Sequence, residues 1–236
     1  GEGTVVYENA AKTFAVQRGD HGTMVTLMVS GSEEYERPRQ ANEEWPHLLL
    51  EQHFHDAFLK RFDLIRFRLD ARLIKQVNGM LPSEYNPSLH AAQATVYFCV
   101  QNLNAGSPGY GDFLWFGLPI FDTRYRDIPE YAAPDAGKSD ATGKFIYSVA
   151  SATLFEGSSH DGDWITMDVD VLPMIGRAFE EAKRREYLTE SELSDMALSS
   201  MNVGWEVPGT FDVGIQLRGI DLTGQLSQER LSPLGE

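Results

Sequence analysis

The chain has 236 residues, of which 42% are hydrophobic, so it contains enough apolar material for a core and is not an intrinsically disordered segment. Its 35 acidic residues outnumber its 20 basic residues and give a net charge of −15, which argues against nucleic acid or a membrane surface as a partner. A polyanionic substrate is disfavoured for the same reason, and a neutral ligand is the simplest expectation.

Strand-like segments dominate the chain. The clearest one covers 62–73, where Ile65, Phe67 and Leu69 alternate with Arg66 and Arg68. A period of two held over this length predicts a strand with one face in a core and the other in water. Further strand-like segments cover 23–29, 46–52, 94–101, 112–121, 144–149, 164–171, 198–207 and 211–222. One cysteine, Cys99, lies in the 94–101 segment, so no intrachain disulfide contributes to the fold.

One segment has a helical pattern instead. Apolar Ile175, Ala178, Phe179 and Ala182 recur at helical spacing, after a proline suited to a first turn. The sequence has no alternation of strands and helices, no internal repeat and no low-complexity linker. We therefore predict an all-β chain, with residues 1–236 forming a single antiparallel β-sandwich of the jelly-roll, concanavalin A-like kind. One α-helix is inserted near residues 173–187, and we expect its apolar stripe to pack on the outer face of a sheet. The long stretch 124–143, rich in Pro, Gly, Asp and Ala, is predicted to form a wall over a ligand groove.

Two segments place a carboxylate beside aromatic residues on a predicted strand. In 111–116 Asp112 precedes Trp115, and in 202–209 Trp205 precedes Glu206. Sugar-cleaving sites need two carboxyl groups that face each other across a groove. They also use aromatic rings, because the apolar face of a sugar packs well on them. The pattern is also compatible with solvated acidic side chains and core tryptophans.

The C-terminal third resembles the family-12 glycoside hydrolases, which are concanavalin-like jelly rolls. The resemblance lies in the order of a helix, a strand ending in Gly-Trp-Glu-Val-Pro-Gly at 204–209, and a last strand. It implies that Glu206 is the acid/base, that Asp112 takes the place of the nucleophilic Glu, and that the reaction is retaining. Asp112 departs from the family pattern in being Asp, and Trp115 comes one position early.

The resemblance further implies a polysaccharide or oligosaccharide ligand, an extracytoplasmic or secreted location and no cofactor, although a structural calcium ion is compatible with an acidic sandwich. Residues that we expect to bind the substrate are Trp115, Trp205, Tyr110, Tyr125 and Arg124. The sequence favours another role for this arginine, an ion pair with Asp122 or Asp127 that pins the long loop.

Two other functions remain open from the sequence. The first is a non-catalytic, lectin-like domain that uses the same aromatic residues without a carboxylate pair. The second is a cupin-like metal protein, because Glu51, His53 and His55 would share one face of a strand. The further Glu of a cupin site is absent from its expected place, and we predict that this group holds no tightly bound transition metal. The distance between the carboxyl groups of Asp112 and Glu206 separates a hydrolase from a binding domain.

Overall fold

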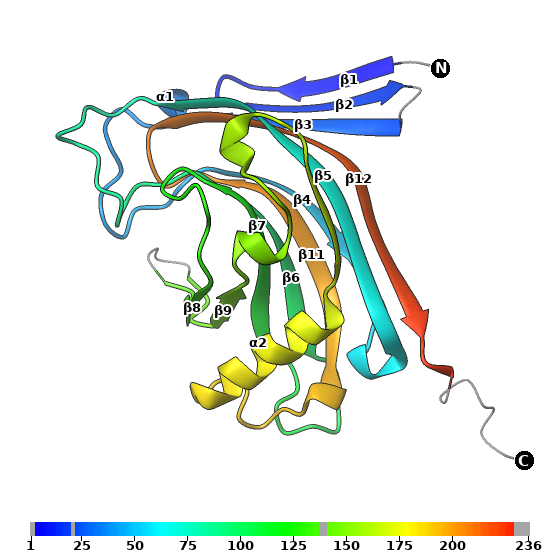
Figure 1. The fold of residues 1–236 in the computed structure, drawn as a ribbon. Coiled ribbons are helices and arrows are strands. Elements are labelled where there is room, and N and C mark those ends of the chain that lie inside the picture. The colour runs from blue at the N-terminus through cyan, green and yellow to red at the C-terminus, as the bar shows by residue number, and fades with distance from the viewer. Residues whose placement is uncertain (1–2, 20–21, 137–140, 229–236) are drawn as a thin grey trace, which may run out of the picture.

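The computed structural model describes residues 3–19, 22–136 and 141–228, and these fold into two packed β-sheets (Figure 1). Sheet A has the strand order β1-β2-β3-β12-β5-β10 and sheet B the order β4-β11-β6-β7-β9-β8. The strands of sheet A are β1 (Gly3–Glu8), β2 (Lys12–Gly19), β3 (Gly22–Ser30), β12 (Phe211–Leu226), β5 (Phe62–Asn78) and β10 (Ile165–Asp170). Those of sheet B are β4 (His47–His53), β11 (Met196–Glu206), β6 (Gln93–Asn102), β7 (Phe113–Asp122), β9 (Phe145–Ser148) and β8 (Tyr131–Pro134). The helices are α1 (Gly31–Glu34), α2 (Leu172–Arg184) and the 3₁₀ turns η1 (Leu59–Arg61), η2 (Ser151–Thr153), η3 (Ser159–Asp161) and η4 (Leu193–Asp195).

The predicted all-β sandwich with one long helix is confirmed, with one correction to the strand directions. β7 and β9 pair in parallel, whereas the other strand pairs are antiparallel. A parallel pair needs a long connection. That connection is the 124–143 stretch, which was predicted to be a loop wall; its described part contains β8, and residues 137–140 lie outside the described residues.

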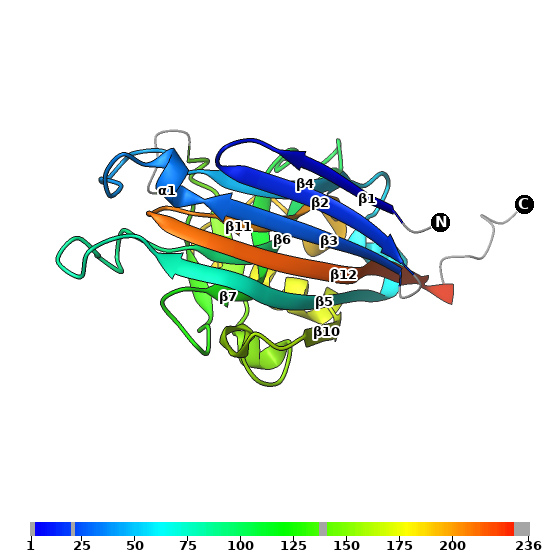
Figure 2. The same ribbon diagram turned by 90° about the horizontal axis from the view of Figure 1, so that it is seen from above.

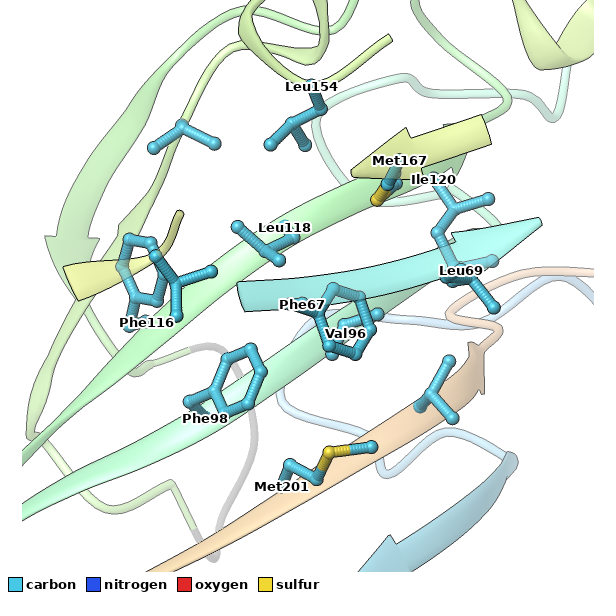
Figure 3. Close-up of a cluster of buried hydrophobic side chains, with 14 of the residues drawn as sticks. Phe67, Leu69, Val96, Phe98, Phe116, Leu118, Ile120, Leu154, Met167 and Met201 are labelled. Atoms are coloured by element: carbon cyan, nitrogen blue, oxygen red, sulfur yellow. The ribbon is translucent and has the colours of Figure 1, made fainter. Parts of the chain in front are cut away.

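The alternation seen in the sequence sets the core. In β5, Ile65, Phe67 and Leu69 are 3%, 0% and 0% exposed, as predicted, because the period-two pattern turns all three toward sheet B. Figure 3 shows Phe67 and Leu69 of β5 meeting Phe98 of β6 and Phe116 of β7 between the two sheets. The rings of Phe67 and Phe98 pack edge to face, with centroids 5.5 Å apart.

The predicted helix is present and buries its apolar stripe. Ile175, Ala178, Phe179 and Ala182 are all buried, and the side chain of Asp170 accepts a hydrogen bond from the first helical amide, that of Leu172, at 3.1 Å. α2 contacts β5, β7 and β9, so it closes one side of the sandwich between the sheets (Figure 1). The expected position of the helix on an outer sheet face is therefore wrong, because its buried stripe packs against strands of both sheets. No helix in the described ranges is long and apolar enough to cross a membrane.

An ion-pair cluster on α2 gives a pH-dependent contribution to stability. Arg184 and Arg185 lie 2.6 and 2.7 Å from the carboxylate of Glu181, and their hydrogen bonds lower the pKa of Glu181 to about 2. A carboxyl group whose pKa is lower in the folded state than in the unfolded state stabilises the fold when the pH is above the unfolded pKa. This contribution is lost as the pH falls toward the pKa of the folded state. We therefore expect Glu181→Gln to be less stable than the parent at neutral pH. The difference should vanish between about pH 4.5 and about pH 2.

Urea midpoints measured across this pH range test the prediction. Glu180→Gln is the matched control, because it removes the same charge from the exposed neighbouring position. A Glu181→Gln difference that persists unchanged at the acid end of the range would show that the two arginine pairs do not contribute as described.

Candidate functional site

The face of sheet B that turns away from sheet A is called here the open face. Residues of β6 such as Val96 and Phe98 point into the core, so Thr95, Tyr97 and Cys99 point to the open face. In Figure 1 the strands arch with sheet A on the outside of the curve, which makes the open face the concave one. This is the surface on which the sequence candidates are expected to meet.

Aromatic side chains form a strip across the open face. Trp115 of β7 packs edge to face against Phe113, with centroids 5.4 Å apart, and against Tyr97 of β6, at 6.4 Å. Tyr131 of β8 pairs with Ser148 of β9 in the same sheet and is 51% exposed. Of the predicted sugar platforms, Trp115 thus lies on the open face, half-buried and among other rings.

A polar row crosses the middle of the same face. Asn202 of β11, Tyr97 of β6, Gly117 of β7 and Ser148 of β9 are neighbours in register. Tyr97 and Ser148 share a hydrogen bond, and burial, with a smaller effect of the Glu206 charge, raises the pKa of the Tyr97 phenol. A Cβ at position 117 would lie 2.2 Å from Ser148 Oγ and 2.8 Å from Tyr97 Cε1, so only glycine leaves room for this contact.

The side chain of Asn202 ends this row with an unused acceptor. Its buried Oδ1 accepts no hydrogen bond from the described residues. Because a buried polar atom is costly without a partner, this position suits a ligand hydroxyl. This row was not predicted from the sequence. The signal was the polar residues that alternate with Val96 and Phe98, but their neighbours come from strands far apart in the chain.

Glu206 lies at one end of the open face. It is the last residue of β11, is half-buried, and is in register with Gln93 of β6, which in turn is in register with Asp122 of β7. Two strand spacings therefore separate the backbones of Glu206 and Asp122, about 9.5 Å. The carboxylate that shares a row with Glu206 is thus that of Asp122, which was predicted only as an ion-pair partner of an arginine.

The oxygens of Asp122 are already engaged. Arg124 approaches Asp122 with a fork, Nε to Oδ1 at 2.9 Å and Nη2 to Oδ2 at 2.6 Å. Gln93 donates a further hydrogen bond to Oδ2 at 2.9 Å, and the Asp122 side chain is only 3% exposed. The hydrogen bonds of Arg124 with Asp122 raise the pKa of the Arg124 guanidinium. A carboxylate held in this way is a structural anion.

Asp112 does not face Glu206, and the predicted catalytic pair is wrong. Asp112 comes directly before β7, at the end of that strand where Phe113 pairs with Gln101. Glu206 of β11 is level with the opposite end of β7, where Asp122 lies. Ten residues of extended chain place the two ends about 33 Å apart. Asp112 instead pairs with Lys144 at 2.7 Å.

Trp205 is a core residue and not a substrate platform. It is 0% exposed, and its indole Nε1 donates a hydrogen bond to the carbonyl oxygen of Leu27 in sheet A at 3.0 Å. The alternation of β11 explains this position, because Glu206 and Trp205 must point to opposite faces of the sheet. Trp205 therefore joins the two sheets beneath Glu206.

The remaining substrate-binding candidates lie at the two ends of β7. Tyr110 is 60% exposed in the turn before β7, at the end far from Glu206. Tyr125 is 43% exposed in the loop after β7, and the Arg124 guanidinium lies 5.3 Å from its ring centroid. The structure thus brings Arg124 and Tyr125 to the Glu206 end of the face.

The candidate metal residues do not form a metal centre. Glu51 and His53 share the open face of β4, 3.7 Å apart, while His55 lies beyond the end of that strand. Within residues 3–19, 22–136 and 141–228, no three His, Cys, Asp or Glu side chains gather closely enough to hold a metal ion. His160 is bonded to the carbonyl oxygens of Asp122 and Tyr125, at 3.0 and 3.1 Å, and so fixes the loop after β7.

Known structures share this fold. A thermo-stable cellulase derived from a cellulase of Rhodothermus marinus aligns with a TM-score of 0.50 and 11% identity, over 94% of this chain and 100% of that one. A family 12 xyloglucanase from Bacillus licheniformis aligns with a TM-score of 0.48 and 11% identity, over 95% of this chain and 87% of that one. A family 11 xylanase from Neocallimastix patriciarum aligns with a TM-score of 0.39 and 11% identity, over 94% of this chain and 95% of that one. The sequence matches no protein-family model and no curated protein. The chain therefore has the fold of the jelly-roll glycoside hydrolases, and at this identity the likeness shows the fold alone.

Proposed function

We propose that this protein binds a neutral β-glycan along the open face of sheet B and does not hydrolyse it. The observation that carries the proposal is the aromatic strip of Phe113, Trp115, Tyr97 and Tyr131 on the concave side of the sandwich. Sugar rings present apolar C–H faces that pack on such rings, and the polar row beside the strip offers partners for their hydroxyl groups. We also propose an extracytoplasmic or secreted location, because that is where a protein that binds a polysaccharide would meet its ligand.

Charge favours a neutral glycan over an acidic one. The chain carries a net charge of −15, and Glu51 and Glu206 add carboxylates to the open face itself. Arg124 is the basic group nearest to Glu206 in the register, but its guanidinium is already paired with Asp122. Lys144 lies over the Phe113 ring but is paired with Asp112, so an acidic polysaccharide would meet repulsion along this face.

The arrangement of carboxylates argues against hydrolysis. Two-carboxylate glycosidases keep both groups available, about 5–5.5 Å apart for retention and about 6.5–9.5 Å apart for inversion. Here Asp122 is enclosed by Arg124 and Gln93. Glu51 is in register with Asn202, four residues along β11 from Glu206, a separation of about 13 Å along the strand.

Binding and hydrolysis are measured together to test the proposal. Calorimetric titration with cello- and xylo-oligosaccharides that span the face should give saturable binding, with no reducing ends released on prolonged incubation. Trp115→Ala should weaken binding about tenfold to a hundredfold, or about 1.4–2.8 kcal/mol, because the central ring of the strip is lost. Ile74→Ala on sheet A is the control and should bind as the parent does. Absence of binding to any β-glycan would contradict the proposal.

A second candidate function rests on the shared row of Glu206 and Asp122. Their two-strand separation would suit an inverting hydrolase if Arg124 released Asp122 when substrate binds. In that case the same incubation would release reducing ends of inverted configuration. Both Glu206→Gln and Asp122→Asn would then abolish the release while binding persisted.

A further inference from the structure

The two lateral edges of the sandwich, where neither sheet covers the core, differ from each other. On one side α2 buries its apolar stripe between the sheets, and η2 and η3 contact β7 beside it. On the other side lie the edge strands β1 of sheet A and β4 of sheet B, and no described helix covers them. Figure 2 shows β1 at one rim of sheet A and β10 at the other. An uncovered apolar side of this kind marks an interaction surface.

β1 and β2 form a ledge that projects from this side. β3 is the strand of sheet A with the most contacts to β4 and β11, and Phe14 of β2 still packs against the core, so β1 forms the outer rim of the ledge. Val5 and Tyr7 of β1 are in register with Val16 and Phe14 of β2, and they turn toward the side of sheet B. Val5 is 52% exposed and Tyr7 66% exposed, with the Tyr7 ring stacked on Phe14 at 6.1 Å.

Both edges on this side lack the usual protection against strand pairing. Natural proteins protect edge strands with short length, proline, lysine or inward charges. On the far side β8 has four residues and ends at Pro134, and β10 carries Asp168 and Asp170. β1 reads Gly-Thr-Val-Val-Tyr-Glu and β4 reads His-Leu-Leu-Leu-Glu-Gln-His, with neither proline nor lysine.

A pocket that is lined mainly by apolar residues, together with Glu51 and Gln52, opens beside the same edge. It has a volume of about 380 Å³ and lies between the core-facing sides of β4, β11 and β12. Its lining includes Leu50 and Phe54 from the β4 segment and Ile220 and Leu222 of β12. The hydrophobic core is therefore not sealed at the β4 edge.

We propose that the ledge and the β4 edge are the interface of a two-fold symmetric homodimer. In this arrangement β1 of each copy lies beside β4 of the other, and the inner faces of the two ledges stack on each other. The arrangement is self-consistent, because one two-fold axis brings the exposed Val5 and Tyr7 of β1 in one copy against the same residues of the other copy. A single symmetry operation thus covers both edges and all four inner-face apolar side chains.

Charge favours a second copy of this chain as the occupant. The chain as a whole carries −15, which opposes association through most of its surface. β1, β2 and β4 together carry two acidic residues, Glu8 and Glu51, and two basic residues, Lys12 and Arg18. This side is therefore formally neutral apart from histidine, and two copies can approach through it without the repulsion that the rest of the surface produces.

Sedimentation velocity over a concentration series tests the proposal. The parent should sediment as a dimer, with twice the chain mass of 26.4 kDa. The double variant Val5→Glu, Tyr7→Glu should sediment as a monomer. Val77→Glu, Leu81→Glu is the matched control. It adds the same two charges at apolar sites that are 50% and 62% exposed, away from the ledge, and should remain a dimer. A monomeric parent, or a dimer that the ledge variant leaves intact, would overturn the proposal.

Hydrogen exchange on the unmodified protein gives a second measurement that does not depend on a variant folding. Outward-facing amides of β1 and β4 should exchange slowly when the protein is concentrated and faster on dilution. Amides of β8, at the protected edge, should not respond to concentration. Concentration-independent exchange in β1 and β4 would count against the dimer even if the ledge variant failed to fold.

Discussion

Arg124→Met is expected to lower the free energy of unfolding by about 3–5 kcal/mol, the range for breaking a buried ion pair from one side. The Asp122 side chain is 3% exposed, and Arg124 supplies its Nε and Nη2 as donors. Without the guanidinium, a buried carboxylate keeps only Gln93 and the backbone amide of residue 124 as partners. Chemical denaturation of the variant and the parent at neutral pH measures the loss.

Removal of the other partner should have a smaller effect. The Arg124 side chain is 25% exposed, so in Asp122→Asn its charge can be hydrated, and we expect a loss of about 1–3 kcal/mol. The double variant should be more stable than Arg124→Met alone, because no unpaired buried charge remains. Equal losses for the two single variants would show that the carboxylate is not isolated from water in the way the structure indicates.

The fold was predictable where one face of an element is buried and the other is wet. The alternation around Phe67 and the helical spacing around Phe179 are local patterns, and the structure confirms both elements. The parallel pairing of β7 with β9 was not predictable from such patterns. It depends on how the long connection of residues 123–144 returns to the sheet, and no local periodicity records that path.

The candidate site was predictable only in part, because it depends on register between strands. Glu206 lies on the open face, but Asp112 is about 33 Å along β7 from its row. The sequence shows which residues are neighbours along a strand and not which are opposite each other. Trp205 illustrates the same limit, since its place beside Glu206 in the sequence puts it on the opposite face of the sheet.

The jelly-roll fold and the chemistry of its face lead to different conclusions about function. The fold is shared with a cellulase, and fold alone does not establish an activity. Near the middle of the open face the side chains in register are Asn202, Tyr97 and Ser148, which can form hydrogen bonds with hydroxyl groups, and none of the three is a carboxylic acid. At the end of the face Glu206 and Asp122 share a row, and the carboxylate of Asp122 is enclosed by Arg124. A glycan-binding protein fits both observations.

Phe179→Ala should lower the free energy of unfolding by about 3–5 kcal/mol, as for other buried aromatic truncations. Phe179 is 2% exposed and lies in the middle of the α2 stripe that closes one side of the sandwich. The surrounding sheet cannot collapse into the vacated space, because β7 and β9 are held in register beneath the helix. Urea denaturation followed by tryptophan fluorescence measures the change in midpoint.

Glu180→Ala is the matched control for this helix. Glu180 is the next residue, exposed on the outer side of α2, and its truncation should shift the stability by no more than about 0.5 kcal/mol. Because α2 packs between the sheets and not on the open face, Phe179→Ala should leave the glycan affinity of the folded fraction unchanged. An unaltered midpoint in Phe179→Ala would mean that the helix is not docked between the sheets. A loss of binding without a loss of stability would instead place the ligand at the α2 side, and the open face would no longer be the binding surface.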